Sequence, residues 1–276
     1  MSSEPISSPG NPLLKRIRKL RRRKHRDAER ALFVEGIAPV WQALDSGAEV
    51  EVLVTAPDLL TSEAARELVA SCEGRGTRVV ALTAEAFAGI AEREHPAGLG
   101  AVVRAPERAL DDLVTATSSL VVGLHEVGNP GNLGTIVRTA DAAGAAGVVV
   151  AGTSADPWHP AAVKASMGTV FSTPVVSASL DELLAWSREK GLAVVATSVR
   201  GAVDHWDATF PAPALLLFGS EATGLAPEVL DAADMVVRIP QEGAASSLNL
   251  AVAAGILIYE ARRGLIAPGT SRRKST

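Results

Sequence analysis

Short runs that are apolar at nearly every position, separated by helix-like stretches, recur through the C-terminal part of the chain. The strand-like runs are 118–124, 147–152, 170–177, 192–198, 214–219 and 235–240. Stretches with helical spacing lie among them, at 132–143, 159–166, 179–190 and finally 247–262. Strands without polar alternation are typical of a parallel sheet that helices cover on both faces. The pattern therefore predicts a doubly wound α/β domain.

A second, smaller α/β unit precedes this domain. Its strand-like runs, at 31–36, 51–56, 78–82 and 100–105, alternate with helical patterns at 37–47, 62–72 and 84–94. Pro106 and the polar residues after it indicate a joint. With 276 residues, of which 47% are hydrophobic, the chain is long enough for two cores. We expect a small domain over 1–107, a larger one over 108–264 and a disordered tail over 265–276.

Several classes of protein are excluded by what the sequence lacks. Cys72 is the single cysteine, so no disulfide can form within the chain, and the five histidines show no metal-ligand spacing. No apolar run is long enough to cross a membrane, and the N-terminus lacks the apolar stretch of a secretory signal. We expect a cytoplasmic protein without a metal and without a membrane partner.

The formal net charge of −4 conceals a strongly basic segment. Residues 15–26 contain nine of the 27 lysines and arginines and no acidic residue, which leaves the rest of the chain acidic. Such a segment is either a solvated helix face or a polyanion-binding arm that releases counterions from nucleic acid. Ile17 and Leu20 predict a short helix whose apolar side packs inward. The predicted RNA-binding residues are Lys15, Arg16, Arg18, Lys19, Arg21, Arg22, Arg23, Lys24 and Arg26.

A glycine-rich turn, "NPGNLGTIVRT", follows the first strand of the larger domain. Its glycines, with Gly128, are spaced GxxGxxG, which matches neither the dinucleotide-binding GxGxxG pattern nor the phosphate-binding Walker pattern. One interpretation is local: the glycines allow a sharp turn, Asn132 caps the helix and Arg138 is a surface residue. The other is functional, because the carboxyl edge of a parallel sheet is where α/β folds bind ligands.

Two further strands run into polar loops of the same kind. In "LLLFGSEATGL", Glu221 lies between Gly219 and Gly224; in "IPQEGAASSLNLAVAAGI", Ser247 and Asn249 precede a helix of small residues. Each loop by itself is explained equally well as a turn and a helix cap. Since the carboxyl ends of parallel strands share one edge of a sheet, the three loops together predict a single site.

The motifs "NPGNLGTIVRTADAAG", "LLLFGSEATGL" and "IPQEGAASSLNLAVAAGILIYEA" resemble the three signature motifs of the SpoU (TrmH-like) branch of the SPOUT RNA ribose 2′-O-methyltransferases. The resemblance covers residues 119–262 in order and spacing. The N-terminal part resembles the small substrate-binding domain of ribosomal RNA methylases in this branch. The resemblance implies a trefoil-knotted α/β domain, a homodimer, S-adenosylmethionine as methyl donor and RNA as substrate.

The resemblance also implies the site residues. It places catalytic functions on Arg138, Asn132, Glu221, Ser247 and Asn249. It places the cofactor against Thr197, Ser198, Gly219, Ile239 and Leu248.

A guanidinium group keeps its proton, so we expect Arg138 to clamp a phosphate and stabilise a developing alkoxide, with Glu221 holding its geometry. Two positions depart from the motifs: relatives often carry Met where this chain has Gln241, and a second glycine where it has Ala222.

Three alternatives stay open. A dinucleotide-dependent oxidoreductase fits the doubly wound pattern, but its glycine spacing is absent. A catalytically idle RNA-binding or ribosome-assembly module fits the basic segment, although the intact motif residues favour an enzyme. Transfer RNA is an alternative substrate, but the N-terminal domain and the opening "NPLLKRIRKL" resemble those of ribosomal RNA enzymes, which favours ribosomal RNA.

Overall fold

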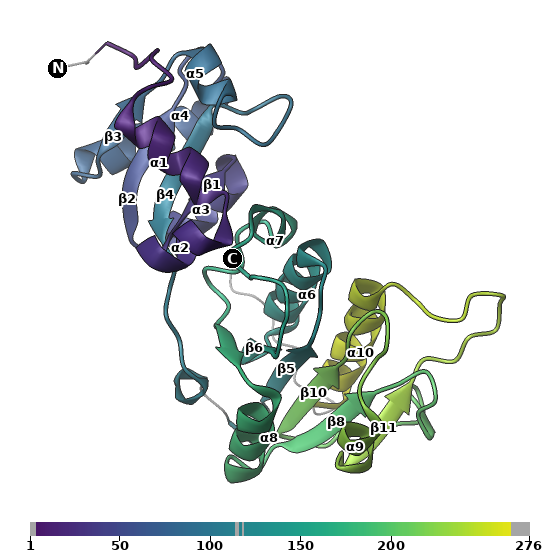
Figure 1. Ribbon diagram of the computed structural model, residues 1–276. Helices are drawn as coiled ribbons and strands as arrows, with labels where there is room; N and C mark the ends of the chain where they lie inside the picture. Colours follow the sequence, from purple (N-terminus) through teal and green to yellow (C-terminus); the bar gives the residue numbers. More distant parts are fainter. Residues whose placement is uncertain (1–3, 114–115, 118, 266–276) are drawn as a thin grey trace. The chain divides into compact units, whose positions relative to one another are not determined.

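The computed structural model describes residues 4–113, 116–117 and 119–265 (Figure 1). Its contacts divide the chain into two compact units: unit 1 comprises residues up to 107 together with 156–172, and unit 2 comprises 108–155 and the residues from 173 onward. The sequence pattern does not anticipate the excursion of 156–172 into unit 1. The tail predicted over 265–276 lies, apart from Leu265, outside the described residues.

Unit 1 is built on a four-stranded mixed sheet with the order β1-β4-β2-β3. Its strands are β1 (Ala31–Glu35), β2 (Val50–Thr55), β3 (Val79–Ala81) and β4 (Leu99–Arg104). Strand β4 is antiparallel to both β1 and β2, whereas β2 and β3 are parallel. Its helices are α1 (Pro12–Leu20), α2 (Arg23–Glu29), α3 (Ile37–Asp45), α4 (Glu63–Gly74), α5 (Ala84–Ala88) and α7 (Pro160–Ala165). The helix predicted over 84–94 is therefore too long, since α5 ends at Ala88 just before Gly89, a poor helix former.

Helix α1 carries most of the basic segment and shows how a cationic helix is held in place. The Asn11 side chain accepts a hydrogen bond from the Leu13 N–H, and Pro12 occupies the first turn. The apolar side of the helix is buried against the sheet, as predicted: Leu14, Ile17 and Leu20 are all at most 1% exposed. Burial of this apolar stripe stabilises the helix and leaves its charged side exposed.

Unit 2 contains a seven-stranded sheet with the order β7-β6-β5-β10-β8-β11-β9, and all its described strand pairs are parallel. The strands are β5 (Leu120–His125), β6 (Gly147–Ala151), β7 (Val175–Ala178), β8 (Ala193–Thr197), β9 (Val203–Asp204), β10 (Ala214–Phe218) and β11 (Met235–Arg238). The predicted parallel α/β domain is confirmed. The strand predicted over 170–177 begins only at Val175, because residues 170–172 form turns in unit 1.

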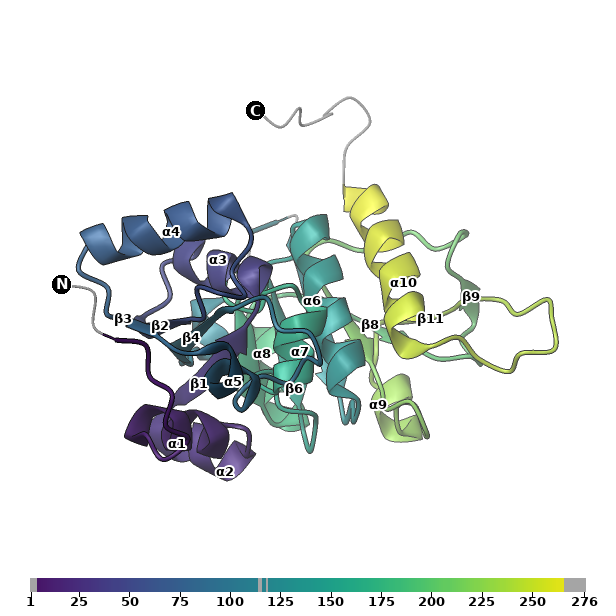
Figure 2. The ribbon, with the colours of Figure 1, turned by 90° about the horizontal axis from the view of Figure 1, so that it is seen from above.

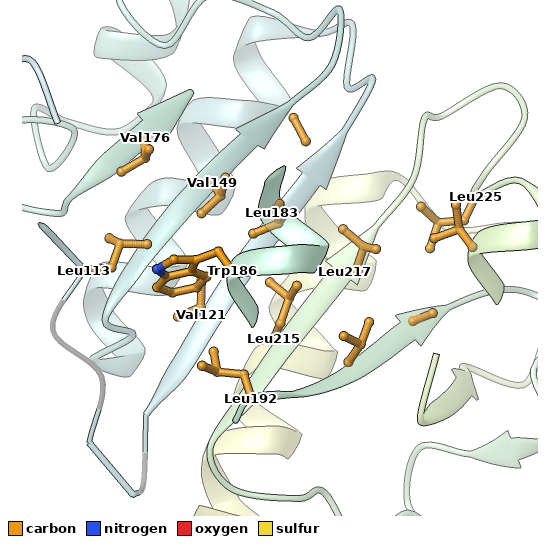
Figure 3. Close-up of a cluster of buried hydrophobic side chains, with 14 residues drawn as sticks. Leu113, Val121, Val149, Val176, Leu183, Trp186, Leu192, Leu215, Leu217 and Leu225 are labelled. Atoms are coloured by element: carbon orange, nitrogen blue, oxygen red, sulfur yellow. The ribbon is translucent and has the colours of Figure 1, made fainter. Parts of the chain in front are cut away.

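Helices cover both faces of this sheet. They are α6 (Pro130–Ala143), α8 (Leu180–Glu189), α9 (Pro227–Asp231) and α10 (Leu250–Leu265), with a short 3-10 turn, η1 (Leu110–Asp112), near the start of the unit. Figure 3 shows Leu183 and Trp186 of α8 packed onto strand residues that include Val121, Leu215 and Leu217. Helices α6 and α10 lie side by side behind the sheet (Figures 2 and 3). This pairing brings the starts of two motif helices to one place.

The described part of the chain holds neither a helix suited to a membrane nor a cluster suited to a metal ion. None of the helices in this part of the chain combines the length and apolar character needed to cross a membrane. The same residues hold no group of three or more His, Cys, Asp or Glu side chains placed to bind a metal ion.

Candidate active site

The loops predicted to form the site leave the same edge of the sheet. Strand β10 pairs in parallel with β5 on one side and with β8 on the other, and β8 pairs in parallel with β11. The residues that follow these strands are Glu126, Ser198, Gly219 and Ile239. Because adjacent parallel strands end together, the sheet brings the motif loops next to one another, as the sequence predicts.

The first motif begins helix α6 with a different cap from the expected one. The Asn129 Oδ1 accepts hydrogen bonds from the backbone N–H groups of Gly131, at 2.8 Å, and of Asn132, at 3.2 Å. Pro130 occupies the first helical position, where its missing N–H costs nothing. Asn132 therefore does not cap the helix, and its side chain is available for contacts with other loops.

The Asn132 side chain joins all three motifs. Its Nδ2 donates to Glu221 Oε1 at 3.0 Å, and its Oδ1 accepts from Asn249 Nδ2 at 3.2 Å. The second Glu221 oxygen, Oε2, accepts from the backbone N–H of Gly128 at 3.2 Å. We call this set, Gly128, Asn132, Glu221 and Asn249, the motif network. Residues separated by 89 to 117 positions in the sequence thus meet through side-chain hydrogen bonds.

Asn249 serves the network and its own helix at once. Its Oδ1 accepts hydrogen bonds from the N–H groups of Ala251, at 2.9 Å, and Val252, at 3.3 Å, in the first turn of α10. This leaves the Nδ2 hydrogens for Asn132. An aspartate would cap the helix equally well but has no hydrogen to donate, so the dual role requires an amide.

The Glu221 carboxylate is held in its ionised form. Burial is the strongest single influence and raises the pKa of this group, but hydrogen bonds from Asn132 and from the N–H groups of Glu221 itself, Gly128 and Asn129 outweigh it. Together they hold the pKa of Glu221 below its usual value of 4.5. The carboxylate is therefore a fixed acceptor at neutral pH and is unsuited to serve as a general acid.

Arg138 lies away from Glu221, which corrects the expectation that the carboxylate holds this arginine. Arg138 follows Asn132 by six residues on α6, which is about 9 Å along the helix axis and on another face. Its side chain is exposed and has no hydrogen bond or ion pair with any residue that the structure describes. Ser247, in the loop before α10, is also exposed. The structure brings Asn132, Glu221 and Asn249 together and leaves Arg138 and Ser247 facing solvent.

The predicted cofactor residues gather at the ends of β8, β10 and β11. Thr197 ends β8, and the Ser198 N–H donates to the carbonyl oxygen of Val237 at 3.0 Å. Gly219 approaches the backbone of Gly224 so closely that a Cβ atom would lie 2.2 Å from the Gly224 carbonyl carbon. Only glycine fits there.

The other two predicted cofactor residues lie on the third loop. Leu248 is 37% exposed, so an apolar side chain faces solvent beside the motif network. Gln241, one of the two departures from the motifs, donates its Nε2–H to the carbonyl oxygen of Ile239 at 2.9 Å. A methionine could not make this bond. The sequence identifies Gln241 as a departure from the motifs, but it does not reveal this hydrogen bond to a predicted cofactor residue.

Five cations of the basic segment are engaged within unit 1. Arg16 forms ion pairs with Glu29 and Glu51, each at 2.6 Å. The guanidinium groups of Arg18 and Arg21 donate to backbone carbonyl oxygens, and Arg23 lies 3.6 Å from Asp27. Arg26 is only 4% exposed and donates to Asp156 at 2.6 and 3.1 Å. Its burial and its pairing with Asp156 give Arg26 a structural role, which sets it apart from the other predicted RNA-binding residues.

The other four cations of the segment face solvent. Lys15, Lys19, Arg22 and Lys24 are exposed, and their side chains form no hydrogen bond or ion pair within residues 4–113, 116–117 and 119–265. Lys15 and Lys19 are one helical turn apart on the outer side of α1, with Arg22 just beyond its end. Sequence alone could not separate this exposed set from the structural cations.

Comparison with known proteins gives the same division of the chain. Residues 119–259 match the model of the SpoU rRNA Methylase family, and residues 11–101 match that of the MRM3-like substrate binding domain. The chain is 35% identical over 246 residues to the 23S rRNA (uridine(2479)-2′-O)-methyltransferase of Streptomyces viridochromogenes, covering 87% of this chain and 85% of the relative. It is 34% identical to the 23S rRNA (adenosine(1067)-2′-O)-methyltransferase of Streptomyces laurentii, covering 89% and 91%.

A solved structure is similar over almost the whole length. The AdoMet-bound rRNA methyltransferase from Sinorhizobium meliloti superposes with a TM-score of 0.86 at 37% sequence identity, covering 96% of this chain and 99% of that one.

Proposed function

Because the chain belongs to the SpoU rRNA Methylase family, we propose that it transfers a methyl group from S-adenosylmethionine to a ribose 2′-hydroxyl of ribosomal RNA. The observation that carries this function is the motif network, which unites Asn132, Glu221 and Asn249 from three distant segments. The two Streptomyces relatives are named for a uridine and an adenosine. Both names specify the 2′-oxygen of the ribose, which every nucleotide contains.

The residues at the strand ends fit S-adenosylmethionine. A neutral adenine ring is recognised by backbone donors and acceptors with apolar contacts, and this edge offers three strand ends, the closely approaching backbones of Gly219 and Gly224, and the exposed side chain of Leu248. When bound, the cofactor supplies an electrophilic methyl group on a sulfonium. We assign its binding to Thr197, Ser198, Gly219, Ile239 and Leu248.

Arg138 acts on the RNA side of the reaction. Its guanidinium group is exposed and without a partner among the described residues, so it is available to bind the phosphate beside the target ribose and to stabilise the alkoxide as it forms. It cannot accept the proton, because a guanidinium remains protonated. The 2′-O–H bond breaks as the O–CH₃ bond forms and the S–CH₃ bond breaks, and the proton passes to a water molecule beside Arg138.

The motif network positions the loops around this reaction. Glu221 fixes the start of α6 through Asn132 and Gly128, and Asn249 fixes the start of α10. Ser247 lies two residues before Asn249 and is exposed, so we assign it to contact the ribose. These residues orient the substrate and carry no proton, because each uses neutral or permanently ionised groups.

The same proposal extends to a homodimer with a trefoil-knotted catalytic domain, as the family resemblance implies. Support for association comes from α10, where Val252 is 53% exposed and Tyr259 is 52% exposed. These two apolar side chains are seven residues apart and so share one face of the helix. A second copy of the chain would cover this face and place two sites at one interface.

Methyl transfer from radiolabelled S-adenosylmethionine tests the function directly. The substrate is total RNA from a strain that lacks the gene, and the 2′-O-methyl mark is then mapped in ribosomal and transfer RNA. We expect one ribosomal site that is absent from the deletion strain and returns with the gene. A mark confined to transfer RNA would overturn the ribosomal assignment. Absence of cofactor binding by calorimetry would favour the idle RNA-binding module instead.

A further inference from the structure

A cavity of about 170 Å³ lies within unit 1, and none of its lining residues belongs to the motif network. Its apolar lining includes Phe33 of β1, Ile90 after α5 and Val163 of α7. The volume is below the ~300–1,000 Å³ of pockets for drug-sized ligands, so the cavity suits a single planar ring system. Nothing in the proposed reaction uses it.

One charged acceptor in the cavity lacks a donor. Glu35 lines it, and its Oε2 accepts a hydrogen bond from the backbone N–H of Glu92 at 2.7 Å. Its Oε1 is buried and has no hydrogen-bond partner among the residues described by the structure. A buried carboxylate oxygen without a donor is costly, so a molecule that brings an N–H or O–H group to it would be stabilised there.

Cations surround the same cavity. Arg93 and Lys164 line it, and neither side chain is engaged in a hydrogen bond or ion pair in the described part of the chain. The Arg93 guanidinium lies over Gly36, where a Cβ atom would come within 3.4 Å of its Nη2. Arg21 also lines the cavity and donates to the Ala91 carbonyl. A ligand with both a donor group and a phosphate matches this combination.

We propose that this cavity binds one unstacked nucleotide of the RNA substrate and prefers a base with an exocyclic amino group. The inference rests on the proposed function, which makes RNA the substrate. The apolar walls and the Arg93 guanidinium would flank the base, and Arg93 and Lys164 would neutralise its phosphate. Glu35 would accept from the amino group of cytosine, adenine or guanine. On its pairing edge, uracil has one N–H group, which lies between two carbonyl oxygens. The negative Glu35 carboxylate would repel these oxygens.

Fluorescence anisotropy with labelled hexacytidylate and hexauridylate tests the base preference without requiring catalysis. We expect the wild-type protein to bind hexacytidylate about 10-fold more tightly, as one selective base contact provides. Glu35→Gln should reduce the ratio to about 2-fold or less, because its amide can donate to uracil O4. Glu94→Gln changes an exposed glutamate outside the cavity and should keep the wild-type ratio.

A second pair of variants tests the cations that line the cavity. Arg93→Ala should weaken both oligonucleotides to a similar extent, whereas Arg78→Ala, which removes an exposed arginine outside the cavity, should change neither. Equal binding of the two oligonucleotides by the wild type would overturn the proposal, as would an undiminished preference in Glu35→Gln. If ribosomal RNA is methylated but no base preference exists, the cavity proposal fails alone. If no RNA is methylated, the proposed function fails.

Discussion

Asn132 uses both ends of its amide group, one toward Glu221 and the other toward Asn249. A side chain with this connectivity links three loops that the parallel strands bring to one edge of the sheet. If Asn132 capped helix α6, as one interpretation of the sequence has it, its side chain could not make both contacts. In the structure, Asn129 caps the helix instead. At the scale of single residues, the site therefore depends on which of Asn129 and Asn132 has a side chain available to contact the other loops.

Removal of the Arg138 guanidinium should impair the chemical step. We expect Arg138→Ala to lower kcat about 10²- to 10³-fold at saturating RNA, because one donor to the developing charge is lost. Arg138→Lys keeps the charge and should retain more activity. Calorimetry with S-adenosylmethionine should show unchanged affinity in both variants. Near-normal turnover by Arg138→Ala would exclude the assigned role.

The lowered pKa of Glu221 predicts a pH dependence of stability. The ionised carboxylate stabilises the folded chain fully above the unfolded-state pKa of 4.5, and this contribution is lost as the pH falls through the lower folded-state value. Between about pH 6 and about pH 3, the melting temperature of Glu221→Gln should therefore fall less than that of the wild type. Glu228→Gln, an exposed change on α9, serves as the control. Parallel curves for Glu221→Gln and the wild type would contradict the assignment.

At the scale of elements, α1 and α2 each combine a structural and an exposed set of cations. Arg16 and Arg26 fasten these helices to acidic groups, while Lys15, Lys19 and Arg22 face solvent. A count of charges along the sequence treats all of them alike. Substitutions in the two sets should therefore have different effects, one on RNA affinity and the other on folding.

The exposed set should determine the salt dependence of RNA binding. The triple variant Lys15→Gln, Lys19→Gln, Arg22→Gln should reduce the slope of log K against log[salt] by about 2, since each phosphate contact contributes about 0.7–0.9. Filter binding over a range of salt concentrations measures the slope. Cofactor affinity should not change, and Arg78→Gln should behave as the wild type. An unaltered slope in the triple variant would show that α1 does not contact RNA.

The buried pair Arg26–Asp156 should affect stability instead. Arg26→Met leaves the Asp156 carboxylate buried without its partner and should lower the free energy of unfolding by about 3–5 kcal/mol in urea denaturation. The double variant Arg26→Met, Asp156→Leu removes both charges and should recover most of that loss. A small effect of the single variant would mean that the pair opens to solvent.

At the scale of the whole molecule, unit 1 is not a simple N-terminal appendage. The chain passes between the units at 107/108, 155/156 and 172/173, so the segment after β6 folds with unit 1 before β7 continues the sheet of unit 2. Its first residue, Asp156, is bound by Arg26 and by the Trp158 N–H. Truncation of the first 107 residues would therefore leave this segment without its core, and experiments should use the full chain.

A homodimer that forms through α10 can be tested by the mass of the protein in solution. Light scattering after size exclusion should give twice the mass of one chain for the wild type. Val252→Glu with Tyr259→Glu should give the mass of one chain, because charges on an apolar interface prevent burial. Trp41→Glu alters an exposed apolar residue of unit 1 and should leave the dimer intact. A monomeric wild type would refute the homodimer.

The class of the fold and the place of the site follow from the sequence alone. Wholly apolar strands require a parallel sheet with covered faces, and polar loops at their carboxyl ends must share one edge, so the convergence of Asn132, Glu221 and Asn249 was predictable. The apolar spacing of Leu14, Ile17 and Leu20 likewise determined which side of α1 is buried. These properties follow from local periodicity.

Which of the polar groups bind one another depends on the tertiary structure. In the structure, Asn129 caps helix α6, and Glu221 binds Asn132 and not Arg138. Arg26 is buried against Asp156, and one carboxylate oxygen of Glu35 has no donor among the described residues. Hydrogen bonds and ion pairs depend on distances of a few tenths of an ångström between segments far apart in the chain. Sequence periodicity carries no information on such distances, so the same charges could be structural or functional until the segments were placed.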